Sequence, residues 1–304
     1  MTDIAIAARP RRARVIINKK IAPYIFLLPF LLLFAIFLIV PLAYALNLSV
    51  YRSALVGGLR FVWFDNYKRA FTDANFWSGV WTLFKFGILQ IPVMLILSLI
   101  FALILDSGVA YARAFFRISF FIPYAVPAVI ATLLWGYMYG PAYGPFAQLA
   151  GVLHLAKPDF FNDSSIIPAI ANIATWEYMG YNMIIYFAAL QAIPMDLEEA
   201  SVMDGASAFT FAFRIKLPMI VPTIIVTIIF SIIGSLQLFT EPYLLINLAR
   251  NTINSHFTPN LYAYTLAFIG QQYNYAAAIS FVLGGVVAIV SYVFMLAANR
   301  RVSE

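Results

Sequence analysis

The sequence predicts an all-α integral membrane protein with six transmembrane helices and both termini in the cytoplasm. Its 304 residues are 63% hydrophobic and only 11% charged, and the mean hydropathy is +0.88. Soluble domains are about half apolar and about a quarter charged, so this class is excluded. The 16 prolines suit membrane helices, which tolerate Pro well. The absence of cysteine excludes disulfide scaffolds, thiolate zinc sites and cysteine nucleophiles.

Six apolar runs reach the roughly 20 residues that a helix needs to cross a bilayer. They cover residues 24–46, 80–105, 118–139, 166–191, 218–238 and 277–298, within a single domain 24–298. The first run follows a basic N-terminus, residues 1–23, but it is too long for a signal peptide, so we expect a retained helix. Lys85 is expected near enough to its helix end to reach the interface. Glu177 lies deep in its run, which makes it a functional-site hypothesis.

The distribution of basic residues predicts the orientation. Twelve of the 19 Lys and Arg residues fall in the N-terminus, in the connections 106–117 and 192–217, and after residue 298. The three opposite connections hold six. The positive-inside rule therefore places both termini, including the tail 299–304, in the cytoplasm. Because the net charge of +6 is explained by topology, a nucleic-acid partner is not expected.

The 192–217 segment is different in kind from the other connections. It gathers four of the chain's 13 acids, Asp196, Glu198, Glu199 and Asp204. Asp196 and Glu199 have the spacing of a capping box, which predicts a short helix that begins after Asp196. Gly205 can end this helix in a left-handed conformation, and Ser207 can cap a second one. The acids would be repelled by an acidic membrane surface, so a protein partner is the better interpretation.

The spacing within this segment is that of a known motif. The matching positions are Glu199, Ala200, Asp204, Gly205, Ala206, Ile215, Leu217 and Pro218. They resemble the EAA loop of permease subunits of binding-protein-dependent ABC importers. Ser201 replaces the motif's second Ala, and the Phe that usually precedes the Ile falls on Ala212. In the family this loop sits in a cleft of a cytoplasmic ATPase subunit, so the resemblance implies an ATPase-coupling role for these residues.

Other stretches are similar to the carbohydrate branch of that family, the maltose, lactose and glycerol-3-phosphate permeases. They are residues 121–129, 189–194 and 266–278, whereas the Gly-Gly-Pro expected after the fifth helix is absent at 248–251. The resemblance implies a bacterial cytoplasmic membrane, a second homologous permease subunit, two ATPase subunits, an extracytoplasmic substrate-binding protein and a carbohydrate substrate. ATP and Mg would be bound by the partner ATPase subunits. No Lys of this chain follows a glycine, so it lacks a Walker-type phosphate loop and we expect no cofactor on it.

A sugar pathway should show aromatic and polar side chains on otherwise apolar helices. The substrate-pathway candidates are Glu177, Tyr178, Tyr181, Ser231, Ser235 and Gln237. In maltose-type permeases the positions that match Tyr178, Tyr181, Ser231 and Ser235 line the sugar site, so the resemblance implies the same role here. The alternative interpretation is that the tyrosines are interfacial anchors and the serines small packing residues.

Two other classes of protein are alternatives to an importer subunit. A proton-coupled secondary carrier would use Glu177 and Glu241 as its proton carriers. An intramembrane enzyme would need paired acids, a Ser/His arrangement or a metal set within the spans, and the sequence offers none of these. We therefore expect no catalytic residue and no metal site on this chain.

Overall fold

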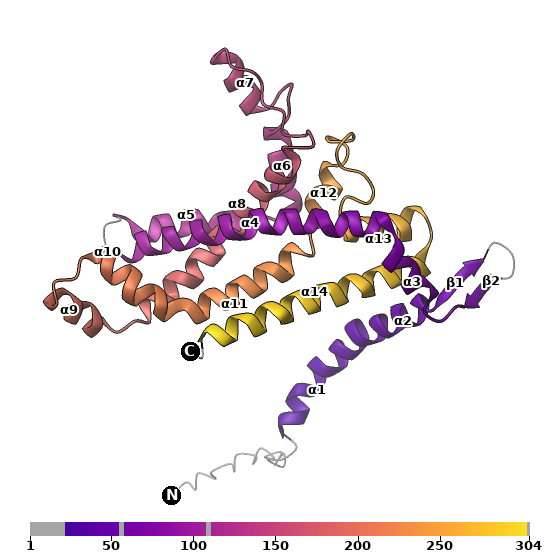
Figure 1. The fold of residues 1–304 in the computed structure, drawn as a ribbon, viewed down its shortest axis with the longest axis horizontal. Helices are drawn as coiled ribbons and strands as arrows, with labels where there is room; N and C mark the ends of the chain where they lie inside the picture. Colours follow the sequence, from indigo (N-terminus) through magenta and orange to yellow (C-terminus); the bar gives the residue numbers. More distant parts are fainter. Residues whose placement is uncertain (1–21, 55–57, 108–110, 303–304) are drawn as a thin grey trace, which may run out of the picture. The chain divides into compact units, whose positions relative to one another are not determined.

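The computed structural model describes residues 22–54, 58–107 and 111–302 (Figure 1). The chain divides into two compact units, residues 1–47 and residues 48–304. The predicted basic N-terminus lies outside the described residues up to position 21, and so do residues 303–304 of the predicted tail.

The described part of the first unit is one apolar helix. α1 (Ala22–Phe34), the π-helical turn η1 (Ala35–Ile39) and α2 (Val40–Ser49) follow one another without a break. Residues 23–49 are long and apolar enough to cross a membrane. This helix contains the predicted 24–46 run.

The second unit opens with a small anchored hairpin. β1 (Tyr51–Ala54) and β2 (Gly58–Phe61) pair antiparallel, with Tyr51 opposite Phe61. The short helix α3 (Asp65–Thr72) follows. Its buried Asn66 donates hydrogen bonds to the carbonyls of Ser49 and Tyr51, at 2.8 and 2.7 Å, which ties α3 to the start of the hairpin.

α4 (Ala74–Asp106) is the longest helix of the second unit. Asp73 caps it, because its carboxylate accepts hydrogen bonds from the backbone N–H groups of Asn75 and Phe76. The helix begins six residues before the predicted 80–105 run. The exposed Lys85 is thus about three turns from its helix end, and its predicted place near that end was wrong because the cap lies at Asp73.

The predicted 118–139 run does not form one straight helix. α5 (Arg113–Ala125) and α6 (Ala128–Met138) are bent by 97° at a short break. Pro123 lies in the last turn of α5 and Pro127 lies in the break itself. Pro removes a backbone donor and disfavours helical conformation in the residue before it. α7 (Pro145–Val152) follows in the next connection.

α8 (Ile166–Gln191) is the central helix of the second unit and has the bounds of the predicted 166–191 run. It packs along α4 and also contacts α5, α6 and α11. Half of its 26 residues are buried. Its large buried side chains, among them Ile170, Ile173 and Tyr186, join the two apolar clusters of this unit.

The 192–217 segment folds as two short helices joined by a turn. α9 (Met195–Met203) precedes α10 (Ala208–Phe211), the π-helical turn η2 (Ala212–Lys216) and α11 (Leu217–Ser235). Pro194, not Asp196, occupies the N-cap position, because its fixed φ starts the helix two residues earlier and leaves Asp196 in the first turn. Gly205 has a φ of +76°, and the Ser207 hydroxyl accepts a hydrogen bond from the backbone N–H of Thr210.

The rest of the unit follows α11. α12 (Thr240–Leu245), α13 (Pro259–Tyr264) and the π-helical turn η3 (Thr265–Ile269) lead to α14 (Tyr273–Val302). α14 contacts α3, α11 and α13. It contains the predicted 277–298 run and extends it at both ends.

Four stretches of the described residues could cross a membrane by length and composition: 23–49, 74–106, 208–245 and 273–298. The bent pair α5 and α6 makes a fifth if it counts as one span. α8 is about 39 Å long but carries many polar residues, and it is not among these stretches. Six spans and cytoplasmic termini therefore stay a prediction.

Candidate functional site

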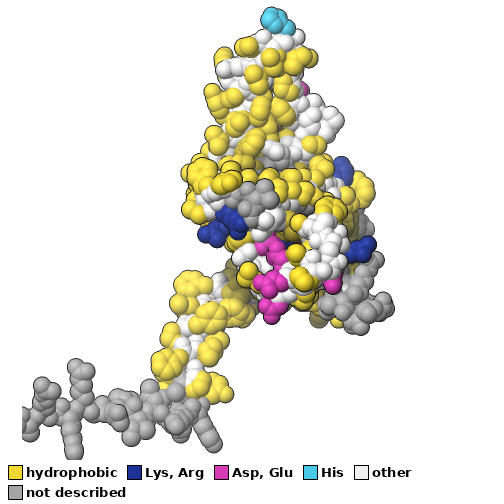
Figure 2. All heavy atoms as spheres, turned by 90° about the vertical axis from the view of Figure 1, so that its left-hand side faces the viewer, with side chains coloured by type: hydrophobic (Ala, Val, Ile, Leu, Met, Phe, Trp, Pro, Cys, Tyr) yellow, Lys and Arg dark blue, Asp and Glu magenta, His cyan; other side chains and the backbone are white. Residues whose placement is uncertain are grey.

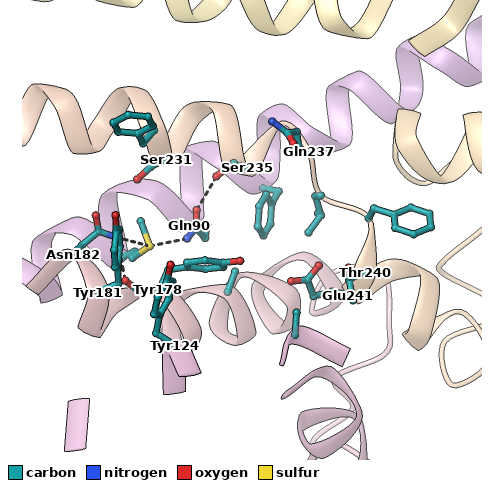
Figure 3. Close-up of a pocket in the computed structure, with 18 residues that line it drawn as sticks. Gln90, Tyr124, Tyr178, Tyr181, Asn182, Ser231, Ser235, Gln237, Thr240 and Glu241 are labelled. Carbon is teal, nitrogen blue, oxygen red and sulfur yellow. Dashed lines mark hydrogen bonds between the residues drawn. The ribbon is translucent and has the colours of Figure 1, made fainter. Parts of the chain in front are cut away.

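A cavity of about 420 Å³ lies in the second unit between α4, α8 and α11 (Figure 3). Its polar lining comes from Gln90, Tyr124, Tyr178, Tyr181, Asn182, Ser231, Ser235, Gln237, Thr240 and Glu241. Phe86, Met94, Phe230 and Phe239 contribute apolar surface. A volume of this size suits a small organic ligand.

Two helix breaks adjoin the cavity. Tyr124 and Ala128 stand on either side of the bend between α5 and α6, and residues 236–239 separate α11 from α12. In membrane proteins, irregular backbone at the depth of the bilayer is tolerated where it is buried in protein or lines a cavity. The two breaks therefore make this cavity the candidate binding site.

Aromatic rings cover one side of the cavity. The rings of Tyr124 and Tyr181 stack at 4.7 Å between centroids with 21° between their planes, and Tyr178 meets Tyr124 edge-on at 6.0 Å. Gly180 makes this arrangement possible. A Cβ atom at Gly180 would overlap the carbonyl oxygen of Phe120, so only glycine lets α5 lie this close to α8.

The opposite side carries a short hydrogen-bond chain from α11 to α4. The Ser235 hydroxyl donates to Gln90 Oε1 at 2.9 Å, and Gln90 Nε2 donates to Met94 Sδ at 3.1 Å (Figure 3). Ser231 and Tyr181 make no side-chain hydrogen bond with any other described residue. Their hydroxyls are thus available to a ligand with hydroxyl groups of its own.

Five of the six predicted substrate-pathway residues line the cavity: Tyr178, Tyr181, Ser231, Ser235 and Gln237. Glu177 does not line it. Glu177 is buried on the adjoining face of α8, and its Oε2 has no hydrogen-bond partner among the described residues. The sequence could not separate Glu177 from Tyr178, because adjacent helix residues point about 100° apart and only the packing shows which one meets the cavity.

Gln90 and Tyr124 line the cavity and were not among the predicted site residues. Gln90 is a polar residue within the mostly apolar α4, which is a usable sequence signal. Tyr124 lies between Pro123 and Pro127, just before the helix break, so the proline pair could have indicated the break beside it.

The lining favours an uncharged polar ligand. It contains no Lys, Arg or His, and Glu241 is its one acid. Aromatic faces pack on apolar ring faces, while amide and hydroxyl groups hydrogen-bond to hydroxyls. Among the described residues, no group of three or more His, Asp or Glu could hold a metal ion.

The 192–217 segment presents its acids to the surface. Asp196, Glu198, Glu199 and Asp204 are all exposed. Figure 2 looks onto the end of the second unit that carries α9, and Asp and Glu side chains gather there. The other positions of the motif differ in exposure. Ala206, Ile215 and Leu217 are half-buried, while Ala200, Gly205 and Pro218 are exposed.

The structure accommodates both departures from the EAA motif. Ser201 is buried, and its hydroxyl donates to the carbonyl of Glu198 at 2.8 Å, so it fills the place of a small residue without an unpaired group. The motif's Phe is absent at Ala212, but the neighbouring Phe211 supplies a buried aromatic side chain just before the π-helical turn η2.

Comparisons with known proteins agree on one family. Residues 94–304 match the binding-protein-dependent transport system inner membrane components. The chain is 32% identical to the lactose transport system permease protein LacF of Rhizobium radiobacter, over 91% of this chain and 94% of that protein. It is 29% identical to the arabinooligosaccharides transport system permease protein AraP of Bacillus subtilis, over 91% and 88%.

The fold is also found in a solved structure. A chain of a bacterial ABC transporter involved in the import of the acidic polysaccharide alginate superimposes with a TM-score of 0.80. The alignment covers 93% of this chain and 98% of that chain at 23% sequence identity, which shows a shared fold.

Proposed function

We propose that this chain, which belongs to the family of binding-protein-dependent transport system inner membrane components, is a permease subunit of an ABC importer for a sugar, oligosaccharide or polyol. The cavity carries this proposal. Its stacked tyrosines, its free hydroxyls and its lack of basic groups fit a polyhydroxylated, uncharged ligand. The relatives named for lactose and arabinooligosaccharide transport support the same class of substrate.

The proposed complex contains this chain, a second homologous permease subunit, two ATPase subunits and an extracytoplasmic binding protein, in a bacterial cytoplasmic membrane. A solved structure with the same fold comes from an alginate ABC transporter in complex with its periplasmic protein, which supports the last of these partners. ATP and Mg bind to the ATPase subunits, and this chain catalyses no reaction. ATP-driven closure of the ATPase subunits pushes the 192–217 segment, and the cavity opens alternately to each side.

Reconstitution tests the proposal directly. The complete complex, in lipid vesicles with ATP inside and binding protein outside, should take up sugar only when both are present. A screen of sugars on the accompanying binding protein identifies the substrate to use. Uptake by this chain alone, driven by a proton gradient, would instead establish the secondary-carrier alternative that uses Glu177 and Glu241.

The docking role of the 192–217 segment has its own test. Glu199→Lys should abolish binding-protein-stimulated ATP hydrolysis while the chain still inserts into the membrane, because the Glu199 side chain is exposed and its reversal disturbs no packing within the chain. Gly205→Val should act likewise, because valine disfavours a positive φ. Asp196→Lys is the matched control on the same helix, outside the motif, and should retain stimulation. Normal stimulation in Glu199→Lys and Gly205→Val would contradict docking through these residues.

A further inference from the structure

The carboxylate of Asp106 lies at the C-terminal end of a helix, an electrostatically unfavourable position for an anion. Asp106 is the last residue of α4, and the C-terminal end of a helix carries partial negative charge, which destabilises a nearby anion. Its side chain is only 6% exposed. Two donors compensate for this position: Gln191 Nε2 lies 2.6 Å from Asp106 Oδ1, and Lys216 Nζ lies 2.6 Å from Asp106 Oδ2.

Lys216 has partners on three elements. Besides Asp106, its ammonium lies 3.6 Å from Glu198 Oε2 on α9, and 4.9 Å from the centroid of the Phe211 ring on α10. The Lys216 side chain is 11% exposed, whereas that of Glu198 is 58% exposed. Thus the inner pair with Asp106 is short and enclosed, and the outer pair with Glu198 is longer and faces solvent.

The π-helical turn η2 places Lys216 at this point. Its hydrogen bonds join residues five apart, as from the Leu217 N–H to the Ala212 carbonyl. Phe211 and Lys216 are also five apart, so the turn aligns both on the buried face, whereas a regular α-helix would align Phe211 with Ile215. Arg214, two residues earlier, is exposed and forms no ion pair among the described residues.

The contacts of Lys216 join elements that are distant in sequence. Asp106 and Gln191 are the last residues of α4 and α8, the two long helices that pack on each other and line the cavity. Glu198 belongs to α9, and its pair with Lys216 is the only ion pair that α9 forms among the described residues. A charged side chain in a buried network holds its neighbours in one arrangement, because breaking it leaves an uncompensated charge.

We propose that Lys216 is a positioning residue that transmits displacement of α9 to the cavity-lining helices α4, α8 and α11, through Asp106 and Glu198. This inference rests on the proposed function, since it concerns how a push on the 192–217 segment reaches the cavity. It assigns a role to three residues outside the EAA motif positions, and it explains the π-helical turn that precedes α11.

The test compares transport with ATP consumption in the complete complex reconstituted in vesicles. Lys216→Met keeps the length and apolar body of the side chain and removes the charge. We expect sugar imported per ATP hydrolysed to fall about five-fold or more, in the range of ordinary coupling energies, while the ATPase subunits still co-purify with the permease. Arg214→Gln is the matched control in the same turn and should leave the ratio unchanged.

Charge exchange separates coupling from mere folding. Asp106→Lys and Glu198→Lys combined with Lys216→Asp reverse every charge of the network, and this variant should recover a larger ratio than Lys216→Met if the three residues act through their charges. If Lys216→Met does not assemble, Asp106→Asn and Glu198→Gln replace it, each of which removes one charge partner of Lys216, and each should lower the ratio. A ratio unchanged from the parent protein in the assembled variants overturns the inference. Failure of the parent complex to couple uptake to ATP would overturn the proposed function instead.

Discussion

At the scale of single residues, the Asp73 side chain links the start of α4 to α13 and α14. Its Oδ2 accepts hydrogen bonds from Tyr262 at 2.9 Å and Tyr275 at 2.6 Å, while Oδ1 caps α4. Arg69 lies over the Tyr275 ring, 3.7 Å from its centroid. Burial alone raises the pKa of Asp73, but the hydrogen bonds from both tyrosines and two backbone N–H groups outweigh it, and the pKa is lowered.

Asp73→Ala should lower the free energy of unfolding by about 1–3 kcal/mol near neutral pH, because it removes a helix cap and leaves two tyrosine hydroxyls without an acceptor. Because the pKa of Asp73 is lower in the folded chain than its ordinary 3.8, this stabilisation is present above that value and is lost as the pH falls through the lowered pKa. Chemical unfolding in detergent at neutral and strongly acidic pH measures both effects.

Asp65→Ala is the control for Asp73→Ala. Asp65 is exposed in the first turn of α3, and its carboxylate lies 3.9 Å from Lys68. Exposed pairs of this kind contribute about 0–1 kcal/mol. An equal loss of stability in the two variants would argue against a structural role for the Asp73 hydrogen bonds.

Tyr181 and Glu177 are four residues apart on α8 and differ in relation to the cavity. Tyr181→Ala should reduce the transport rate at saturating binding protein by about two- to ten-fold, because an aromatic contact contributes about 0.5–1.5 kcal/mol. Glu177→Gln should leave this rate within about two-fold of the parent rate, because Glu177 does not line the cavity. A loss of transport in Glu177→Gln that exceeds the loss in Tyr181→Ala would restore Glu177 as a pathway residue.

At the scale of elements, the cavity depends on breaks and close approaches more than on straight helices. The bend between α5 and α6 brings Tyr124 to the cavity, and Gly180 lets α5 reach α8. The sequence predicted helix over most of these residues, including both bounds of α8. It missed the bend, because an apolar run of this length satisfies the requirement for one span whether or not it is bent.

Gly180→Val should separate α5 from α8 and disturb the stacking of Tyr124 on Tyr181. The added side chain meets the Phe120 backbone, which has no flexible end to move aside. Overpacking of this kind costs about 1–3 kcal/mol, so we expect a lower unfolding temperature together with a lower transport rate. Gly284→Ala in α14 is the control, because a Cβ there meets nothing within 4 Å. Equal stability of the two variants would refute the close approach.

At the scale of the whole molecule, the orientation in the membrane stays a prediction from the Lys and Arg distribution. The chain contains no cysteine, so a single introduced cysteine reports its own accessibility to a thiol reagent that does not cross membranes. Ala208→Cys in α10 should react only from the cytoplasmic side, and Tyr143→Cys, in the 140–165 connection, only from the outside. Both positions are exposed. Labelling with the opposite sidedness would invert the predicted topology.

The sequence alone determined the class of molecule, the approximate places of most long helices and the 192–217 segment, because hydrophobic length, charge distribution and motif spacing are properties of the order of residues in the chain. Five of the six predicted pathway residues line the cavity, and the sequence could select them because they are polar or aromatic residues on apolar helices. Only the tertiary structure decided which faces meet. It excluded Glu177 from the cavity lining, added Gln90 and Tyr124, and joined Asp106, Glu198 and Lys216, because contacts between residues far apart in sequence depend on how helices bend and pack.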